Sequence, residues 1–273
     1  MIYKSIITLN RNARGCYILD TVKGCSYARL NPGGCYGDCY AANIAKRYGF
    51  DFGNPVKRYF IEDDQQLYFN GYNDIKHEAS IIKQIKNIDM PFVRIGEMGD
   101  PSEYWEHTLD VCKNISIAGK KIVIITKHLK TLPNVLLHKL NNQIIINTSI
   151  SALDSKQQIK HRLKQYNRLK PYCKSVLRVV TCDFKIDHFN KIQMELLDNE
   201  NVLETIFRPN PKNDLVIDGV IGIEKRMFLK SEVWASSRIK GVFFGYCKDC
   251  KEMCGVNTNS GDTITPENKG DRI

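Results

Sequence analysis

Short apolar runs rich in β-branched residues alternate with helix-like segments along most of this chain. Two of the runs, Ile122–Ile125 and Ile144–Ile146, are apolar at every position, which is typical of strands buried on both faces. This alternation predicts a parallel sheet whose strands are joined by crossover helices. The expected strands are Cys16–Val22, Phe92–Gly96, Lys121–Thr126, Gln143–Ser149, Ser175–Thr181 and Val202–Phe207. The expected helices are Tyr40–Tyr48, Asp74–Lys86, Ser102–Ala118, Asn134–Asn141, Ser155–Leu169 and Ile186–Leu197.

An alternation of this length can curl into part of a (β/α) barrel or remain an open doubly wound sheet. In both folds, function belongs at the carboxyl ends of the strands. We predict an α/β fold in which residues 1–230 form a partial (β/α)6 TIM-like barrel. Residues 231–273 are expected to form a C-terminal cysteine-rich extension, made of a cysteine knuckle and a flexible tail. The aromatic, irregular region 49–73 is expected to face substrate as an insertion or lid.

A glycine-rich loop directly after the first expected strand carries Cys25, Cys35 and Cys39. Three thiols can meet only if the backbone doubles back between them, and the glycines at 33, 34 and 37 permit the positive φ angles that this requires. Thiolates prefer soft metals, which here means an iron–sulfur cluster, zinc or copper(I). The loop is therefore the leading candidate for a metal centre, and a set of buried or disulfide-bonded cysteines is the alternative.

A second cysteine group, Cys247, Cys250 and Cys254, has the spacing C-x2-C-x3-C. This spacing is typical of a zinc knuckle or of an auxiliary iron–sulfur cluster. Three ligands leave a fourth to be found. The candidates are substrate and the remaining cysteines, Cys16, Cys112, Cys173 and Cys182.

Composition narrows the class of protein. The 273 residues carry a formal charge of +10, which favours nucleic acid or another acidic partner without identifying one. A basic rim of Lys127, His128, Lys130 and the segment Lys156–Arg168 would suit such a substrate. No apolar run approaches the ~20 residues that a membrane helix needs. Residues 1–5 lack the apolar core of a secretory signal, so we expect a cytoplasmic protein with reduced thiols.

The cysteine loop resembles that of the radical S-adenosylmethionine superfamily, in particular its phage-type branch. The pairs Gly24-Cys25 and Gly34-Cys35 and the triplet Cys39-Tyr40-Ala41 match the pattern G-C, G-C, C-Y-A. The resemblance continues in order through Phe92–Pro101, Ile124–Lys127, Asn147–Ser151 and Leu177–Val180. The chain departs from the usual C-x3-C-x2-C spacing, because position 42 is alanine and the third ligand is then Cys25.

The resemblance implies a 4Fe-4S cluster on Cys25, Cys35 and Cys39 whose open iron binds S-adenosyl-L-methionine, with a flavodoxin- or ferredoxin-like protein as reductant. It implies reductive cleavage to a 5′-deoxyadenosyl radical that modifies or repairs an unknown substrate, with nucleic acid the first class to test. Glu97, after Gly96, would bind the methionine ammonium and Arg178 its carboxylate. The other expected cofactor contacts are Asn147, Ser149 and Ser151 to ribose, Asp100 and Lys127 to cofactor or substrate, and Tyr40 to the cluster or adenine.

Two other functions use the same cysteines. In a zinc-stabilised nucleic-acid-binding protein, both cysteine groups are structural and the positive charge carries function. In an iron–sulfur electron-transfer or redox protein, the cluster binds no S-adenosylmethionine and Glu97 has no cofactor role.

Overall fold

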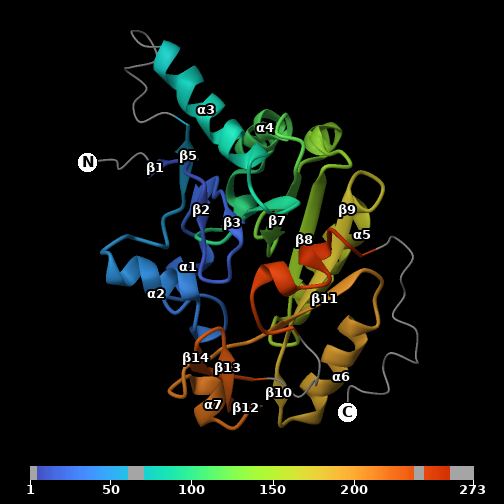
Figure 1. Ribbon diagram of the computed structural model, residues 1–273. Helices are drawn as coiled ribbons and strands as arrows, with labels where there is room; N and C mark the ends of the chain where they lie inside the picture. The colour runs from blue at the N-terminus through green and yellow to red at the C-terminus, as the bar shows by residue number, and fades with distance from the viewer. Residues whose placement is uncertain (1–4, 61–70, 237–242, 259–273) are drawn as a thin grey trace.

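The computed structural model describes residues 5–60, 71–236 and 243–258. Its centre is a seven-stranded sheet in the order β11-β9-β8-β7-β6-β3-β2, in which every pair from β11 to β3 is parallel and only β2 is antiparallel (Figure 1). The α/β class predicted from the strand and helix alternation is therefore confirmed. The strands are β2 Asn10–Arg11, β3 Tyr17–Ile18, β6 Phe92–Ile95, β7 Lys121–Thr126, β8 Ile144–Ile150, β9 Lys174–Thr181 and β11 Val202–Ile206.

The helices follow the predicted segments closely. The longer ones are α2 Tyr40–Arg47, α3 Gly71–Lys86, α4 Trp105–Ser116, α5 Lys156–Leu169 and α6 Asp187–Leu197. Ser155 begins α5 with a capping box, since its hydroxyl accepts from the Gln158 amide and the Gln158 side chain accepts from the Ser155 amide. The shorter elements are α1 Tyr27–Leu30, α7 Asp214–Ile217 and the 3-10 turns η1 Cys35–Gly37, η3 Pro101–Tyr104, η4 Asn134–Lys139, η5 Cys247–Asp249 and η6 Met253–Gly255. The expected helix at Asn134–Asn141 is thus a 3-10 turn.

The first expected strand, Cys16–Val22, is only partly a strand of the main sheet. Residues Tyr17–Ile18 pair with β2 and β6, after which the chain leaves the sheet. Val22–Lys23, which is β4, joins β1 Ser5–Ile6 and β5 Val56–Tyr59 in a separate small sheet. The break lies at Asp20, whose buried carboxylate accepts backbone hydrogen bonds from the turn after β6.

Two further strand pairings were not expected from the sequence. β10 Asp183–Phe184 pairs with β12 Ile221–Gly222, and β13 Glu224–Phe228 forms an antiparallel hairpin with β14 Ser231–Ala235. The hairpin spans residue 230, the expected boundary between the barrel and the C-terminal extension. Much of the expected insertion at 49–73 and most of the expected tail lie outside the described residues.

The two faces of the main sheet are covered by different parts of the chain. Side chains alternate between faces along each strand. Val93, Ile122 and Ile144 pack against α3 and α4. On the other face, Phe92, Val123, Ile145 and Val176 pack against Cys16 and against the segment that carries η5 and η6. Figure 1 shows that red segment lying beside β8.

The C-terminal segment thus covers a sheet face that these helices leave open. Burying one side chain such as Phe92, which is fully buried, contributes about 1.5–3 kcal/mol.

Across the described ranges, no helix combines the length and apolar character needed to cross a membrane.

Candidate metal centre

The backbone of the cysteine loop brings Cys35 and Cys39 together. Cys35 begins η1 and Cys39 immediately precedes α2. Gly34, the residue immediately before Cys35, has φ +69°, and a Cβ built on it would overlap the Cβ of Cys39. Glycine is therefore required at position 34 for two reasons: the backbone has a positive φ angle, and there is no room for a side chain. Of the three glycines expected to permit the wrap, Gly34 and Gly37, the latter with φ +78°, have positive φ, whereas Gly33 does not.

Cys25 reaches the same region from β4. It packs with Cys39 and Met98 against an apolar cluster formed by Ala28, Ala41, Ala42, Ala45 and Phe52. Ala42 is buried in this cluster, so the position that carries a cysteine in the usual superfamily spacing is here part of the packing of α2. The thiols of Cys25 and Cys35, and those of Cys35 and Cys39, lie within electrostatic range of each other.

Burial keeps the thiols of Cys25 and Cys35 protonated in the absence of a cation. It raises the pKa of Cys25, and the nearby Asp100 and Cys35 add to the effect. Burial also raises the pKa of Cys35, against the opposing charge of Lys127. Because a bound metal takes thiolates, metal loading here must release protons. In the described part of the chain, no three His, Cys, Asp or Glu side chains are already arranged around a single ion. The ligands of a cubane cluster stand farther apart than those of one tetrahedral ion.

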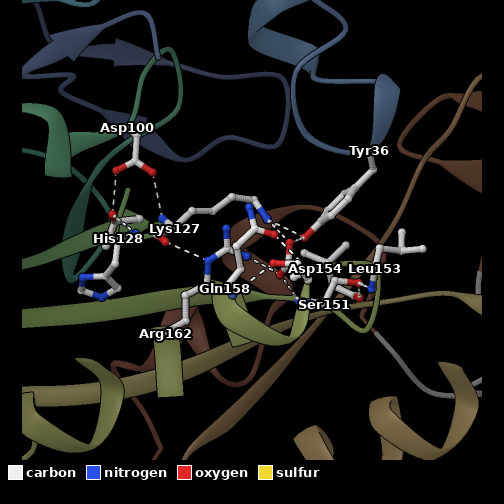
Figure 2. A network of polar contacts seen from close by, with 12 residues as sticks. Tyr36, Asp100, Lys127, His128, Ser151, Leu153, Asp154, Gln158 and Arg162 are labelled. Atoms are coloured by element: carbon white, nitrogen blue, oxygen red, sulfur yellow. Dashed lines mark hydrogen bonds and ion pairs between the residues drawn. The ribbon is translucent and has the colours of Figure 1, made fainter. Parts of the chain in front are cut away.

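Tyr36, the residue after Cys35, anchors the loop to the carboxyl ends of three strands. It has φ +61°, and its hydroxyl donates to Asp154 Oδ1 at 2.8 Å (Figure 2). Lys127 Nζ lies 2.5 Å from the same hydroxyl and 4.3 Å above the ring. The ring also meets Phe207 edge-on, with the centroids 5.7 Å apart. Lys127, Asp154 and Phe207 follow β7, β8 and β11, so the loop lies over the edge where parallel sheets carry function.

The charged side chains of this network pair with one another, and a single carboxylate serves two cations. Asp154 pairs with Arg162 and lies 3.7 Å from Lys127 Nζ. Although burial opposes the shift, Lys127 and Arg162 lower the pKa of Asp154. The Arg162 Nε donates to the Lys127 carbonyl at 2.8 Å, which ties α5 to the end of β7. Asp154 was not a predicted site residue, and Arg162 was expected only within the basic segment Lys156–Arg168. Their meeting with Tyr36 depends on contacts across more than a hundred residues.

The turn after β6 is held by a residue that sequence reasoning missed. The Asp20 carboxylate accepts from the backbone N–H groups of Gly96, Glu97 and Met98 at 2.8–2.9 Å. Gly96 has φ +99°, and a Cβ there would overlap the Ile125 carbonyl oxygen. The same turn is joined to the cysteine loop, because Gly24 N donates to the Met98 carbonyl at 2.9 Å. Glu97 thus lies on a rigid turn next to Cys25.

The side chains of Glu97 and Asp100 already have protein partners. Glu97 Oε2 accepts from Asn12 Nδ2 at 2.9 Å and forms an ion pair with Arg94. Asp100 is buried. Its carboxylate accepts from the Ser102 amide at 2.9 Å, the Thr126 hydroxyl at 2.6 Å and the Lys127 amide at 2.8 Å. Asp100 therefore clamps the turn after β6 to the end of β7, and Glu97 keeps the more open carboxylate.

The remaining predicted cofactor residues lie in three different places. Ser149 and Ser151 are buried at the end of β8, where the Ser151 hydroxyl donates to the Val180 carbonyl at 2.9 Å. Tyr40 is 57% exposed at the start of α2. Asn147 Nδ2 instead donates to the Cys254 carbonyl at 3.1 Å, and Arg178 Nη1 lies 4.0 Å from the Cys254 sulfur. Asn147 and Arg178 therefore contact the C-terminal cysteine group.

Comparison with known proteins adds no relative to this description: no protein-family model, curated protein or solved structure matches the chain.

Proposed function

We propose that this protein is a radical S-adenosylmethionine enzyme whose 4Fe-4S cluster is bound by Cys25, Cys35 and Cys39. The observation that carries the proposal is the position of the three-thiol loop. It lies at the carboxyl edge of a largely parallel sheet, tied through Tyr36 to residues that follow three of the strands.

We infer that the sheet is the wall of a partial (β/α)6 barrel rather than a doubly wound sheet. In a doubly wound sheet, helices cover both faces. Here α3 and α4 pack on one face, and α5 packs on that same face through Tyr166 and Leu169. The other face holds the C-terminal segment and the polar side chains of Arg94, Asn147 and Arg178. This one-sided arrangement supports a barrel wall with an inner face that receives ligands.

When bound and reduced, a cluster with one open iron would supply the one electron that cleaves S-adenosylmethionine into methionine and a 5′-deoxyadenosyl radical. The chain's own residues would bind and orient the cofactor. Glu97 would accept from the methionine ammonium, and Asp20 would keep its turn in place through three backbone hydrogen bonds. Met98, Phe52 and the alanines of α2 would exclude water beside the thiols.

For cofactor to bind at Glu97, the ammonium must share or replace the guanidinium of Arg94. That pairing favours a second candidate function, an iron–sulfur redox protein without S-adenosylmethionine, because the carboxylate is already neutralised. The two candidates differ in whether Glu97 matters for cofactor affinity.

The substrate is proposed to be an acidic molecule, with nucleic acid the first class to test. Two residues expected in the basic rim are not available to a substrate. His128 is buried, and Lys127 is paired within the network described above. Exposed lysines remain on α5, and these are Lys156, Lys160 and Lys164.

The proposal is tested on anaerobically purified protein by iron and sulfide analysis, followed by reduction with dithionite in the presence of S-adenosylmethionine. We expect about four iron and four sulfide at this centre and formation of 5′-deoxyadenosine. Cys39→Ala should remove both, whereas Cys112→Ala, at a fully buried thiol of α4, should keep both. Glu97→Gln should keep the iron and weaken S-adenosylmethionine binding. A loaded cluster that forms no 5′-deoxyadenosine and binds cofactor equally well with and without Glu97 would favour the redox protein.

A further inference from the structure

The second cysteine group acquires a neighbour from the other end of the chain. Cys16, just before β3, is fully buried and packs in the same apolar cluster as Cys247, which is 4% exposed. The Cys247 amide donates to the Arg14 carbonyl at 2.8 Å, which fixes this approach through the backbone. Both cysteines belong to the cluster on the face of the sheet opposite α3 and α4.

The turn of η6 directs Cys254 toward the same place. Met253 and Cys254 both have positive φ, 42° and 56°, a conformation that residues other than glycine adopt only when their surroundings enforce it. The following Gly255 packs so closely on the sheet that a Cβ would lie 2.7 Å from a methyl group of Val176. The Cys250 amide donates to the Cys247 carbonyl at 3.2 Å, and the Cys250 thiol donates to Glu252 Oε2 at 3.3 Å. Cys254 lies near both Cys16 and Cys250, so the four thiols lie in one region.

The other three cysteines do not compete for this role. Cys112 and Cys173 pack in the apolar cluster against α3 and α4, and Cys182 packs with Phe184 and Phe207. Of the four cysteines that the sequence leaves as candidates for a fourth ligand, only Cys16 lies beside the C-terminal group in the described part of the chain.

The arginine side chains around the four thiols favour a negatively charged centre. Arg14, Arg94 and Arg178 all act on the thiol of Cys247, and Arg178 has the Cys254 sulfur as a side-chain contact. Arg94 also pairs with Glu97. Partly buried guanidinium groups are stable when paired with negative charge. Four thiolates repel one another unless a cation joins them, and four thiolates around a divalent zinc or a typical iron–sulfur cluster keep a net negative charge. A metal thiolate centre would satisfy both requirements.

We propose that Cys16, Cys247, Cys250 and Cys254 form a second metal site, a closed four-thiolate centre for an iron–sulfur cluster or zinc on the inner face of the sheet, with Arg178 as its charge partner. No three of these thiols are arranged around a single ion in the described residues, so a cluster, whose ligands stand farther apart, fits their spacing better than zinc. All four positions are filled by protein, so this centre offers no open coordination position to substrate. It joins the start of the sheet to the C-terminal segment. The site does not depend on whether the Cys25 loop binds S-adenosylmethionine.

The experiment measures zinc, iron and sulfide in the full chain, purified anaerobically, as wild type and as single variants. Cys250→Ser is the first variant, since Cys250 is half-buried and its loss should leave the fold intact. Cys16→Ser tests the new ligand, and Cys112→Ser is its control because both thiols are fully buried. Cys35→Ala separately removes the first centre.

We expect Cys16→Ser and Cys250→Ser each to lose the same complement of metal, while Cys112→Ser keeps the wild-type content. Loss of about one zinc without sulfide identifies a zinc site, and loss of iron together with sulfide identifies a cluster. With cobalt(II) loaded in place of zinc, the thiolate-to-cobalt absorption band should weaken in Cys16→Ser. The proposal is overturned if Cys16→Ser or Cys250→Ser retains the full metal content, or if Cys112→Ser loses as much. Absence of the first cluster, on which the radical enzyme proposal depends, would instead appear in Cys35→Ala, whose metal content would then equal that of wild type.

Discussion

His128 should make the folded protein lose stability in mild acid. It lies just after β7, is 1% exposed, and has its Nε2 3.0 Å from the Thr148 hydroxyl and its ring 5.6 Å from that of Trp105. Burial lowers the pKa of His128 to about 3, with His161 and Arg162 adding to the effect. The ring is therefore neutral in the folded protein at both pH 7.5 and pH 5.0.

The magnitude follows from proton linkage. In the unfolded chain, the pKa of a histidine is about 6.5. Between pH 6.5 and about 3, the unfolded chain binds a proton at His128 that the folded protein does not, so the free energy of unfolding falls as the pH is lowered. The contribution is fully present above pH 6.5. Lowering the pH from 7.5 to 5.0 should remove about 2 kcal/mol through this one residue.

The assay is urea unfolding followed by circular dichroism at both pH values, for wild type and His128→Asn. Asparagine is chosen because His128 has φ +49°, which asparagine tolerates better than most residues. The variant will be less stable at both pH values, but its loss between pH 7.5 and 5.0 should be about 2 kcal/mol smaller than that of wild type. Exposed His138 provides the control, and His138→Asn should leave the pH difference unchanged. An equal pH difference in wild type and His128→Asn would refute the reasoning.

Three other substitutions test how the cysteine loop is held. Asp154→Asn leaves two buried cations without their anion and should destabilise the protein by about 3–5 kcal/mol, measured by urea unfolding at pH 7.5, and an effect below 1 kcal/mol would contradict the pairing. Gly34→Ala should lower the iron content of anaerobically purified protein, because its Cβ would overlap that of Cys39, whereas Gly49→Ala, with open space around it, should keep the iron. Asp20→Asn replaces a carboxylate that accepts three backbone hydrogen bonds and should lower thermal stability, with hydrogen exchange faster at residues 96–98 and unchanged along β8.

The regular elements were predictable because their signals are local. Continuous apolar runs marked β7 and β8, and the serine before α5 marked the start of that helix. The failures arise where distant groups decide. The expected strand Cys16–Val22 is broken at Asp20, whose partners lie more than seventy residues away. The segment Asn134–Asn141 has helical spacing but forms a 3-10 turn between β7 and β8.

The candidate site divides in the same way. The three cysteines of the first loop could be selected from their spacing and their glycines, whereas Tyr36, Asp154 and Asp20 carried no signal that separated them from ordinary surface or loop residues. Asn147 and Arg178 were correctly placed on neighbouring strands, which pair with Ser149 opposite Arg178. Their contacts with Cys254 could not be foreseen, since those depend on where the C-terminal segment crosses the sheet.

By itself, the amino-acid order determined the alternation of strands and helices and the presence of two thiol-rich segments, because side-chain volume, polarity and glycine content act over a few neighbouring residues. Only the tertiary structure decided which thiols become neighbours. Cys16 and Cys247 stand near opposite ends of the chain, and they meet because both lie on the sheet face that α3 and α4 leave uncovered. That meeting depends on the alternation of side chains between the two faces of each strand and on a contact between segments far apart in the chain, which no local pattern encodes.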